Sequence, residues 1–379
     1  MKLLCAGPTS ISPEVQKAMG TFLTNPDLDK EYTNFHRNME RKISKLVKTD
    51  ALSFVMLGEA IMGLEASIAS LMEKDDNVLV IYNGVFGKGF EDYVKRYGGN
   101  PTLLEFDGTK GIDINKLEDY LKTNSNFKIA TLVHCETPSG ITNDIEKICQ
   151  LLNKYNILSI VDSVSAIGGE YINFDKFKVD ILIGGTQKCL SAPTGLTTIT
   201  ISKRAIDSIK NRKTPIIGYY LNFKNYFDYG YGDFDFPYTM NENLVYALDK
   251  ALDLTLSKDF EKIHSEAAKA VRYTLNKSGL ELYPKNSFSN TVTTVKAPEN
   301  LKSKDILEKL KEKDIIISGG FIGDLENTFR IGHMGNNISH DNFKDLFKNL
   351  DLVFKELDFK LNSSLYDNYI DYTNDNPYY

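Results

Sequence analysis

The sequence predicts an α/β fold with a mainly parallel sheet, and two stretches carry this prediction. Residues 157–161, ILSIV, form an apolar run that follows a helical pattern between Asp144 and Leu152, the order expected of a strand–helix–strand unit. A second apolar run, residues 179–183, ends in the turn sequence GGTQK. Asp162 and Lys188 therefore follow two strands at one edge of the sheet, where open α/β folds bind their ligands.

An acid and an amine at one sheet edge have two interpretations. One is a plain ion pair or two solvated side chains, because Lys and Asp on loops are usually exposed. The other is a pair that acts on a bound molecule. The segments VDSVSAIGG and GGTQKCLSAPTGL, which contain Asp162 and Lys188, favour the second interpretation. They resemble the cofactor region of the class V pyridoxal-phosphate-dependent aminotransferases, and within that class most closely the alanine-glyoxylate and serine-pyruvate aminotransferase group.

This resemblance implies a role for each residue. Lys188 would form a Schiff base with the aldehyde of pyridoxal 5′-phosphate and afterwards move a proton as general base and acid. Asp162 would pair with the protonated pyridine nitrogen and keep the ring an electron sink. Val164 and Gln187, their neighbours in the chain, are predicted to bind the cofactor too. The resemblance further implies a large domain with a seven-stranded, mainly parallel sheet, a smaller C-terminal α/β domain, and a homodimer with active sites at the subunit interface.

Bulk composition sets wider limits. With 379 residues, 42% of them hydrophobic and 25% charged, the chain has room for two domains of an ordinary globular protein. A formal net charge of -6 without any basic run argues against a nucleic-acid partner. No apolar stretch approaches the roughly 18 residues of a membrane span. The cysteines lack C-x-x-C spacing and the histidines are scattered, so we expect no metal site and a cytoplasmic protein.

A turn after residues 53–57 predicts an anion site. This apolar run leads through Gly58 and Glu59 into a helical pattern over residues 62–72, and the free N–H groups at a helix start attract anions. The resemblance implies that the backbone amides of Ala60 and Ile61 bind the cofactor phosphate here. Glu59, however, stands where a serine is common. A carboxylate would repel the phosphate, so either Glu59 points away or the assignment is wrong.

Two further strand ends reach the same crevice. Residues 77–82 lead to Phe86, whose ring the resemblance places on the pyridine face, where stacking would hold the cofactor plane. The alternative is that Phe86 is a core residue at a helix start. Residues 128–133 lead to Thr137, which the resemblance places near the 3′ oxygen of the cofactor, while His134 and Cys135 are expected to be packing residues. No G-x-G-x-x-G or phosphate-binding-loop motif supports nucleotide binding.

The N-terminal arm and one long loop are expected to meet a partner subunit. The resemblance places residues 1–20 across the partner, with Gly7 at the substrate mouth, although Gly7-Pro8 by itself only marks a turn. His36 and Arg37 are expected to precede a helix. Residues 211–240 are aromatic and turn-rich, and loops of this length usually have a function. The resemblance implies that Thr239 binds the phosphate held by the neighbouring subunit.

Arg330 is the predicted substrate anchor. It interrupts an apolar strand in the segment FRIGHMG, and a buried guanidinium requires an anion. Its planar fork suits a carboxylate, and the segment resembles the substrate-carboxylate motif of the family. A structural salt bridge is the alternative. Helical and strand patterns surround Arg330 in residues 255–361, the predicted small domain, after a large domain over residues 21–254. Residues 362–379 form a polar, tyrosine-rich tail without a core pattern.

Together these features predict a transaminase that moves an amino group from alanine or serine to glyoxylate or pyruvate in a ping-pong reaction. Two alternatives stay open: a 2-aminoethylphosphonate–pyruvate transaminase, and a cofactor-bound regulator or complex subunit without turnover. A cysteine desulfurase would share the fold, but it requires a cysteine in the small domain, and none follows Cys189.

Overall fold

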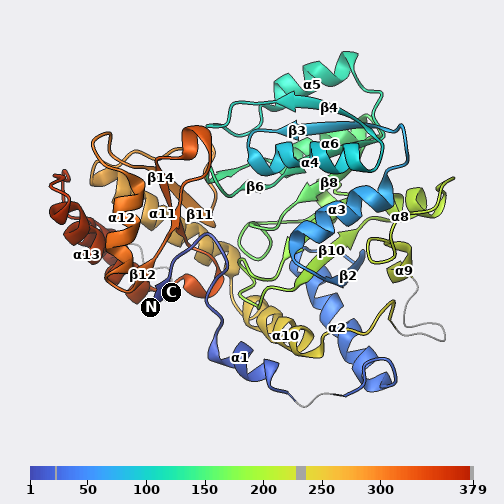
Figure 1. Ribbon diagram of the computed structural model, residues 1–379, viewed down its shortest axis with the longest axis horizontal. Helices are drawn as coiled ribbons and strands as arrows, with labels where there is room; N and C mark the ends of the chain where they lie inside the picture. The colour runs from blue at the N-terminus through green and yellow to red at the C-terminus, as the bar shows by residue number, and fades with distance from the viewer. Residues whose placement is uncertain (22–23, 228–235, 376–379) are drawn as a thin grey trace.

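The computed structural model describes residues 1–21, 24–227 and 236–375 and contains a seven-stranded sheet (Figure 1). The strand order is β2-β10-β9-β8-β5-β3-β4, and only β10 runs antiparallel to its neighbours. The strands are β2 (Leu52–Leu57), β3 (Asn77–Tyr82), β4 (Asn100–Glu105), β5 (Ile129–Val133), β8 (Leu158–Asp162), β9 (Ile181–Gly185) and β10 (Leu196–Ile201). The mainly parallel, seven-stranded sheet is therefore confirmed.

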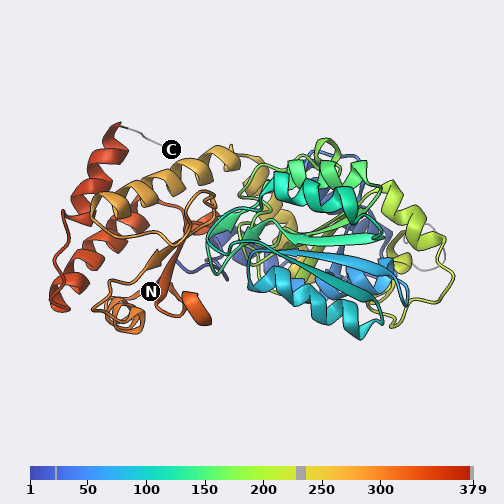
Figure 2. The same ribbon diagram turned by 90° about the horizontal axis from the view of Figure 1, so that it is seen from above.

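Helices cover both faces of this sheet, as Figure 2 shows. The central strands β5, β8 and β9 are buried along their whole length, which explains their continuous apolar sequences. The main helices of this part are α2 (Lys30–Leu46), α3 (Ala60–Leu71), α4 (Val85–Arg96), α5 (Ile114–Thr123), α6 (Ile145–Lys154), α8 (Lys203–Lys210) and α10 (Glu242–Leu256). None of the helices in the described ranges combines the length and apolar character that a membrane crossing requires.

A second, smaller unit lies beside the large sheet (Figures 1 and 2). Its three-stranded sheet has the order β11-β14-β13 and its own apolar core. Its elements are α11 (Phe260–Lys277), β11 (Val292–Lys296), α12 (Ser303–Lys311), β12 (Ile315–Ile316), β13 (Ser318–Gly319), β14 (Thr328–Gly332), α13 (His340–Glu356) and α14 (Leu365–Asp375). The two separate cores support a division into a large and a small domain, whose boundaries stay a proposal.

The N-terminal arm joins the two units. Strand β1 (Lys2–Leu3) pairs in parallel with β12 of the small unit. Helix α1 (Pro13–Met19) then packs against α10 of the large unit (Figure 1), and it begins at Pro13 with Ser12 as its N-cap. Residues 2–10 thus make their observed contacts within this chain, and the predicted contact with a partner subunit stays a prediction.

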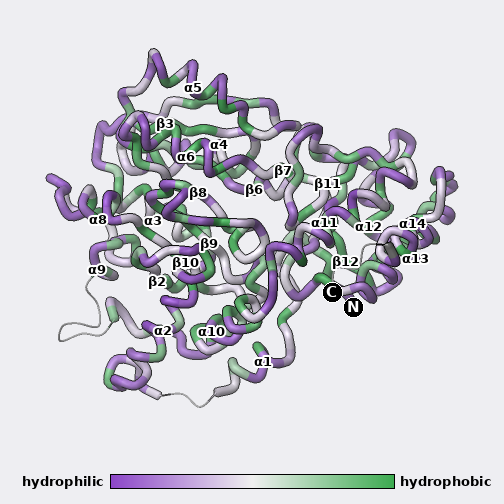
Figure 3. Tube along the Cα trace, turned by 180° about the vertical axis from the view of Figure 1, so that it is seen from behind, coloured by the Kyte–Doolittle hydropathy of each residue, from purple (hydrophilic) through white to green (hydrophobic). Residues whose placement is uncertain are grey.

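The tail differs from its prediction. The expectation that the residues after 361 lack a core pattern is wrong, because α14 packs against α11 and α13 and buries Leu365 and Tyr369 completely. In Figure 3 the outer helices of the small unit, labelled α13 and α14, are coloured mainly hydrophilic with a few hydrophobic positions. A buried face on an otherwise polar, tyrosine-rich helix explains why the hydrophobic pattern is weak.

Two smaller differences concern helix and strand starts. His36 and Arg37 do not precede a helix but lie inside α2, which begins after the N-cap Asp29. One face of that helix buries polar and aromatic side chains, including Tyr32 and His36. Strand β9 begins at Ile181 instead of Val179, and β4 was not predicted.

Candidate active site

Asp162 and Lys188 lie at the same edge of the large sheet. Asp162 is the last residue of β8, its register partner on β9 is Ile183, and Lys188 follows β9 by three residues. The carboxylate is 6% exposed, and burial raises its pKa to about 6. The N–H group of Val164 donates to Oδ1 of Asp162 over 3.0 Å, and this bond and the charge of Lys188 both counteract the rise. The charges of the acid and the amine therefore influence each other at this edge of the sheet.

The amine of Lys188 is held by the N-terminal arm. Its Nζ donates to the carbonyl oxygen of Ala6 over 2.6 Å. Gly7 has φ +90°, and a Cβ added there would lie 2.3 Å from Cδ of Lys188. Burial lowers the pKa of Lys188, and the positive charge of Arg330 lowers it further. A partly buried amine with a lowered pKa is neutral more often at a given pH, and therefore reacts more readily as a nucleophile and base, than an ordinary lysine.

Arg330 lies in β14 and approaches the same crevice from the small unit. Its Nε donates to the carbonyl oxygen of Gly319 over 2.8 Å, and its Nη1 reaches the carbonyl oxygen of Thr137 over 3.5 Å. Among the described residues, no carboxylate forms an ion pair with Arg330, which counts against the structural salt bridge. Burial lowers the pKa of this guanidinium. The site therefore presents a partly buried cation without a charged partner, as an anchor for a substrate carboxylate requires.

Phe86 and Thr137 lie where two neighbouring strands end. Phe86 is in the first turn of α4 and is 39% exposed, so it is not the core residue that the alternative interpretation requires. The hydroxyl group of Thr137 is buried and lies 2.5 Å from that of Ser165. Both positions are compatible with the roles that the resemblance implies, which stay predictions.

Sequence reasoning missed Glu136. Its carboxylate accepts hydrogen bonds from the backbone N–H groups of Phe86, over 3.3 Å, and Gly87, over 2.7 Å, and so caps helix α4. Burial raises its pKa to about 7, and the nearby Asp162 contributes to the rise. A glutamate in the segment HCETPSG carries no signal of this role, because the helix that it caps lies about fifty residues earlier in the chain.

The predicted phosphate site is engaged by carboxylates. Oε2 of Glu59 accepts the N–H group of Ile61 over 2.9 Å, and Oε1 of Glu59 accepts the side-chain amide of Gln187 over 2.7 Å. The hydroxyl group of Thr239 donates to Asp27 over 2.6 Å. Glu59 therefore does not point away from this turn but forms the N-cap of α3.

The residues present fit one part of the predicted cofactor better than another. Lys188 and Asp162 influence each other at this sheet edge, where the segment with Thr137 and the first turn of α4 with the exposed ring of Phe86 follow neighbouring strands. These groups suit a pyridine ring with an aldehyde. The phosphate end fits poorly in this conformation, because Ile61, Gln187 and Thr239 all donate to carboxylates. A phosphate requires those donors for itself.

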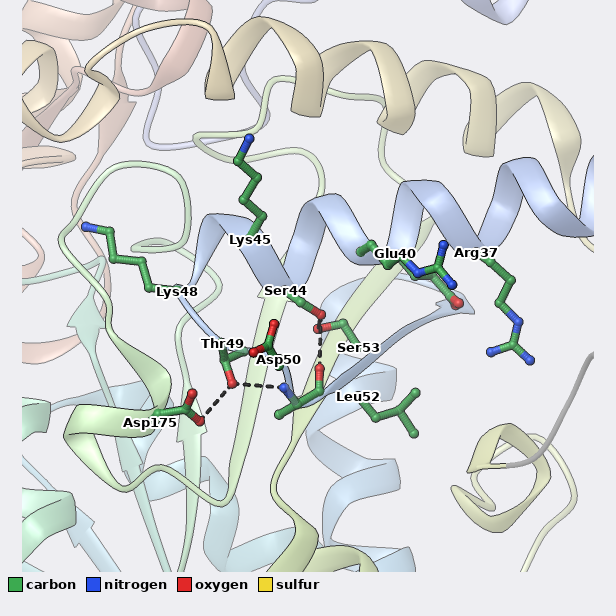
Figure 4. A pocket seen from close by; sticks show the side chains of 12 residues that line it. Arg37, Glu40, Ser44, Lys45, Lys48, Thr49, Asp50, Leu52, Ser53 and Asp175 are labelled. Carbon is green, nitrogen blue, oxygen red and sulfur yellow. Dashed lines mark hydrogen bonds between the residues drawn. The ribbon is translucent and has the colours of Figure 1, made fainter.

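A separate polar groove lies at the other edge of the sheet (Figure 4). It is formed by the C-terminal half of α2, the turn that follows it, the start of β2, and Asp175. Thr49 connects Asp175 to the backbone of Ala51 in this groove. Because β2 begins here and ends at Leu57, at the opposite end of the strand, the groove is distinct from the site that contains Lys188.

Comparisons with known proteins agree with this geometry. The family model described as aminotransferase class-V matches residues 2–333. The chain is 35% identical to an uncharacterised aminotransferase of Methanocaldococcus jannaschii over 370 residues, which cover 96% of this chain and 94% of the relative. It is 32% identical to the pyridoxamine–pyruvate transaminase of Mesorhizobium japonicum over 338 residues, covering 88% and 86%.

Solved structures show the same fold. The pyridoxamine–pyruvate aminotransferase of Mesorhizobium loti superposes with a TM-score of 0.93 at 28% identity, over 99% of this chain and 97% of the other. The ureidoglycine–glyoxylate aminotransferase of Bacillus subtilis superposes with a TM-score of 0.92 at 26% identity, over 97% of each chain. The family and these structures indicate pyridoxal 5′-phosphate as the cofactor. The chain belongs to the class V aminotransferases.

Proposed function

We propose that this enzyme transfers an amino group from a small amino acid, alanine or serine, to a 2-oxo acid such as glyoxylate or pyruvate. The observation that carries the proposal is the partly buried amine of Lys188, whose pKa is lowered by burial and by Arg330, and whose charge interacts with the carboxylate of Asp162. Relatives support the substrate class, since they include an alanine–glyoxylate aminotransferase of Drosophila melanogaster and a serine–glyoxylate aminotransferase of Arabidopsis thaliana, each 28% identical to this chain.

Each residue has a distinct task in this proposal. Lys188 removes the proton from the substrate α-carbon and returns it one position away. Asp162 supplies a fixed negative charge that stabilises a cationic ring nitrogen. Arg330 binds the substrate carboxylate with two parallel hydrogen bonds. The bound cofactor would supply the electron sink that this proton removal requires.

The amino donor is the least constrained part of the proposal. Relatives differ in their named donors, which include L-aspartate, (S)-ureidoglycine and pyridoxamine. A bifunctional relative from Clostridioides difficile with an aminoethylphosphonate transaminase activity in its name is 29% identical, and 53% of its length is covered. This relative keeps 2-aminoethylphosphonate as the second candidate donor.

We also propose a homodimer in the cytoplasm, with Thr239 and the surrounding loop at the subunit interface. Exposed apolar and aromatic side chains support this assembly, since Ile217 is 67% exposed, Tyr219 62% and Tyr220 53%. Apolar side chains gathered on one exposed segment are typical of interaction sites. The proposed domains are the arm at residues 1–20, a large domain at 21–254, a small domain at 255–361 and the segment 362–379, whose helix α14 packs on the small domain.

Spectroscopy with a panel of amino donors tests the reaction. The protein is loaded with pyridoxal phosphate, its visible absorbance is recorded, and alanine, serine and 2-aminoethylphosphonate are added in turn. We expect alanine or serine to remove the visible band and glyoxylate or pyruvate to restore it. A response to 2-aminoethylphosphonate alone would support the second candidate. A band that no amine changes would support a regulator without turnover.

A further inference from the structure

Glu59 occupies the start of helix α3 in a way that changes what the pocket can bind. Its two carboxylate oxygens accept two different donors, the backbone N–H group of Ile61 at 2.9 Å and the side-chain amide of Gln187 at 2.7 Å. Gln187 directly precedes Lys188 in the chain and is 5% exposed. The carboxylate of Glu59 is therefore fixed next to the residue that carries the reactive amine.

In this arrangement the N–H group of Ile61 and the side-chain amide of Gln187 already donate to Glu59, and a phosphate would need these donors. A helix start binds phosphate because its N–H groups point at the anion and the helix dipole favours negative charge. Here the same N–H group and dipole already stabilise a carboxylate. A phosphate in this place would have to displace Glu59 or lie beside it, and two like charges side by side repel each other.

The remaining polar atoms at this end are acceptors. Oε1 of Gln187 is buried and has no hydrogen-bond partner among the described residues, while Nε2 of the same side chain is committed to Glu59. The amide orientation follows from that bond, because a carboxylate can only accept. Gly185 lies beneath this amide, since a Cβ added there would lie 3.0 Å from Oε1 of Gln187. A buried, unpartnered acceptor next to a carboxylate calls for a ligand that donates a hydrogen bond.

The surrounding charges agree with this requirement. The carboxylates of Glu59, Asp162 and Glu136 interact at this edge of the sheet, since Glu59 raises the pKa of Asp162 and Asp162 raises that of Glu136. Lys188 and Arg330 supply positive charge on the side that faces the small unit. An anionic group of a ligand is therefore favoured near Arg330 and disfavoured near Glu59.

We propose that Glu59 makes this site prefer the unphosphorylated vitamin B6 ring, whose hydroxymethyl O–H donates to Oε1 of Gln187 or to the carboxylate of Glu59, and that pyridoxamine is an amino donor of this enzyme. The proposal rests on the amino-transfer function above and names a further donor for the same site. The 2-oxo acid is held by Arg330. The amine-bearing carbon of pyridoxamine is oxidised to the aldehyde of pyridoxal, and the keto carbon of the acceptor is reduced to the amine-bearing carbon of an amino acid. Condensation releases one water and hydrolysis consumes one, so the amino group and the keto oxygen are exchanged.

Equilibrium binding tests the preference without relying on turnover. Pyridoxamine and pyridoxamine phosphate are titrated separately into the full-length protein, freed of bound cofactor, in a calorimeter. We expect the wild type to bind pyridoxamine about tenfold or more tightly than pyridoxamine phosphate. The phosphate would lack the charged hydrogen bonds of a free helix start and would lie next to the like charge of Glu59. A wild-type protein that binds the phosphorylated form more tightly overturns the proposal, and this outcome requires no variant.

Two variants and a control identify the residue. Glu59→Gln removes the charge with little change of shape, and Glu59→Ser opens the helix start. We expect each to shift the preference toward the phosphorylated ring by about tenfold or more, the size expected for one charged contact. Glu65→Gln is the matched control, since Glu65 lies on the same helix and contacts Tyr97 over 2.9 Å, and its preference should equal that of the wild type. An unchanged ratio in folded Glu59 variants contradicts the role of Glu59.

A second readout separates this proposal from the broader one. Pyridoxamine and pyruvate are added to the wild type, and the formation of pyridoxal and alanine is followed. If pyridoxamine neither binds nor reacts while alanine still transfers its amino group to glyoxylate, the donor proposal fails and the amino-transfer function stands. If no ring form binds, both fail.

Discussion

The backbone of Gly7 lies directly against the side chain of Lys188. Gly7 has φ +90°, and a Cβ added to it would come within 2.3 Å of Cδ and 2.7 Å of Nζ of the lysine. The neighbouring Ala6 carbonyl oxygen accepts the lysine amine. The N-terminal arm therefore decides where the amine can lie, although the arm and the lysine turn are far apart in the sequence.

Gly7→Ala should displace Lys188. The added methyl group requires the lysine side chain to move, and we expect kcat/KM to fall by about tenfold or more, equivalent to about 1.4 kcal/mol. The measurement is steady-state kinetics of the amino transfer. Gly98→Ala is the control: it has a similar φ of +79°, and its added Cβ would come no closer than 3.3 Å to the flexible side chain of Lys74. Equal losses of kcat/KM in both variants would show that the positive φ, and not the contact with Lys188, causes the effect. A residue with a side chain costs roughly 1–2 kcal/mol in this backbone conformation.

Arg330→Lys should weaken substrate binding. A lysine keeps the charge but loses the planar fork, so one charged hydrogen bond to the carboxylate is lost, worth about 2 kcal/mol. We expect KM for the 2-oxo acid to rise roughly thirtyfold, with a smaller change in kcat. Arg41→Lys, in the groove of Figure 4, provides the control. An unchanged KM would assign the substrate carboxylate to another residue.

Arg330→Gln should raise the pKa of Lys188. The guanidinium is a positive neighbour that helps to lower this pKa, after burial, so its removal makes protonation easier. Because only the neutral amine reacts with an aldehyde, the pH at which half of Lys188 is trapped by pyridoxal phosphate and borohydride should move upward. Mass spectrometry of the trapped peptide gives this midpoint. A midpoint that stays in place or moves downward would show that Arg330 does not act on the amine.

Asp162→Asn should stabilise the cofactor-free protein at neutral pH while reducing activity. Burial raises the pKa of Asp162 from 3.8 to about 6, so the folded state binds the proton more tightly than the unfolded state. The native carboxylate therefore costs stability progressively as the pH rises from the unfolded pKa toward the folded pKa, and fully above it, by about 3 kcal/mol for a shift of about two units. Urea unfolding should show a stability gain for the variant at pH 8 that shrinks toward pH 4. A gain of constant size would exclude this titration as its cause.

Tyr369→Ala should destabilise the small unit. Tyr369 of α14 is completely buried and packs against Phe347, with ring centroids 5.2 Å apart. Removing a buried aromatic side chain costs about 3–5 kcal/mol. Thermal unfolding measures the loss, and Asp367→Ala on the exposed side of the helix is the control, expected to change stability by about 0.5 kcal/mol or less. Similar behaviour of both variants would show that α14 is dispensable for folding.

The sheet was predictable because its central strands are buried on both faces. Strands β5 and β8 therefore appear in the sequence as continuous apolar runs. The residues that follow them are expected at the same edge of the sheet. Strand β4 escaped prediction because its sequence, NPTLLE, contains a proline and its residues are half-buried or exposed at the sheet edge. Helix α14 escaped for a similar reason, since only a few of its polar-looking residues contact the core.

The site was predictable residue by residue but not in its hydrogen bonds. Lys188, Asp162 and Arg330 belong to local motifs that the sequence displays. The bond between Glu59 and Gln187 joins residues 128 positions apart, and no local pattern specifies it. Sequence alone showed that Glu59 conflicts with a phosphate, and only the structure shows which donors its carboxylate has taken.

The most direct test of the central claim is to locate the lysine that reacts with pyridoxal phosphate. The protein is incubated with the cofactor, reduced with borohydride, digested and analysed by mass spectrometry. We expect a single modified peptide that contains Lys188, and no modification of this peptide in the Lys188→Ala variant. A modification on a different lysine, or none with either pyridoxal phosphate or pyridoxal under conditions where the protein is folded, would contradict this expectation.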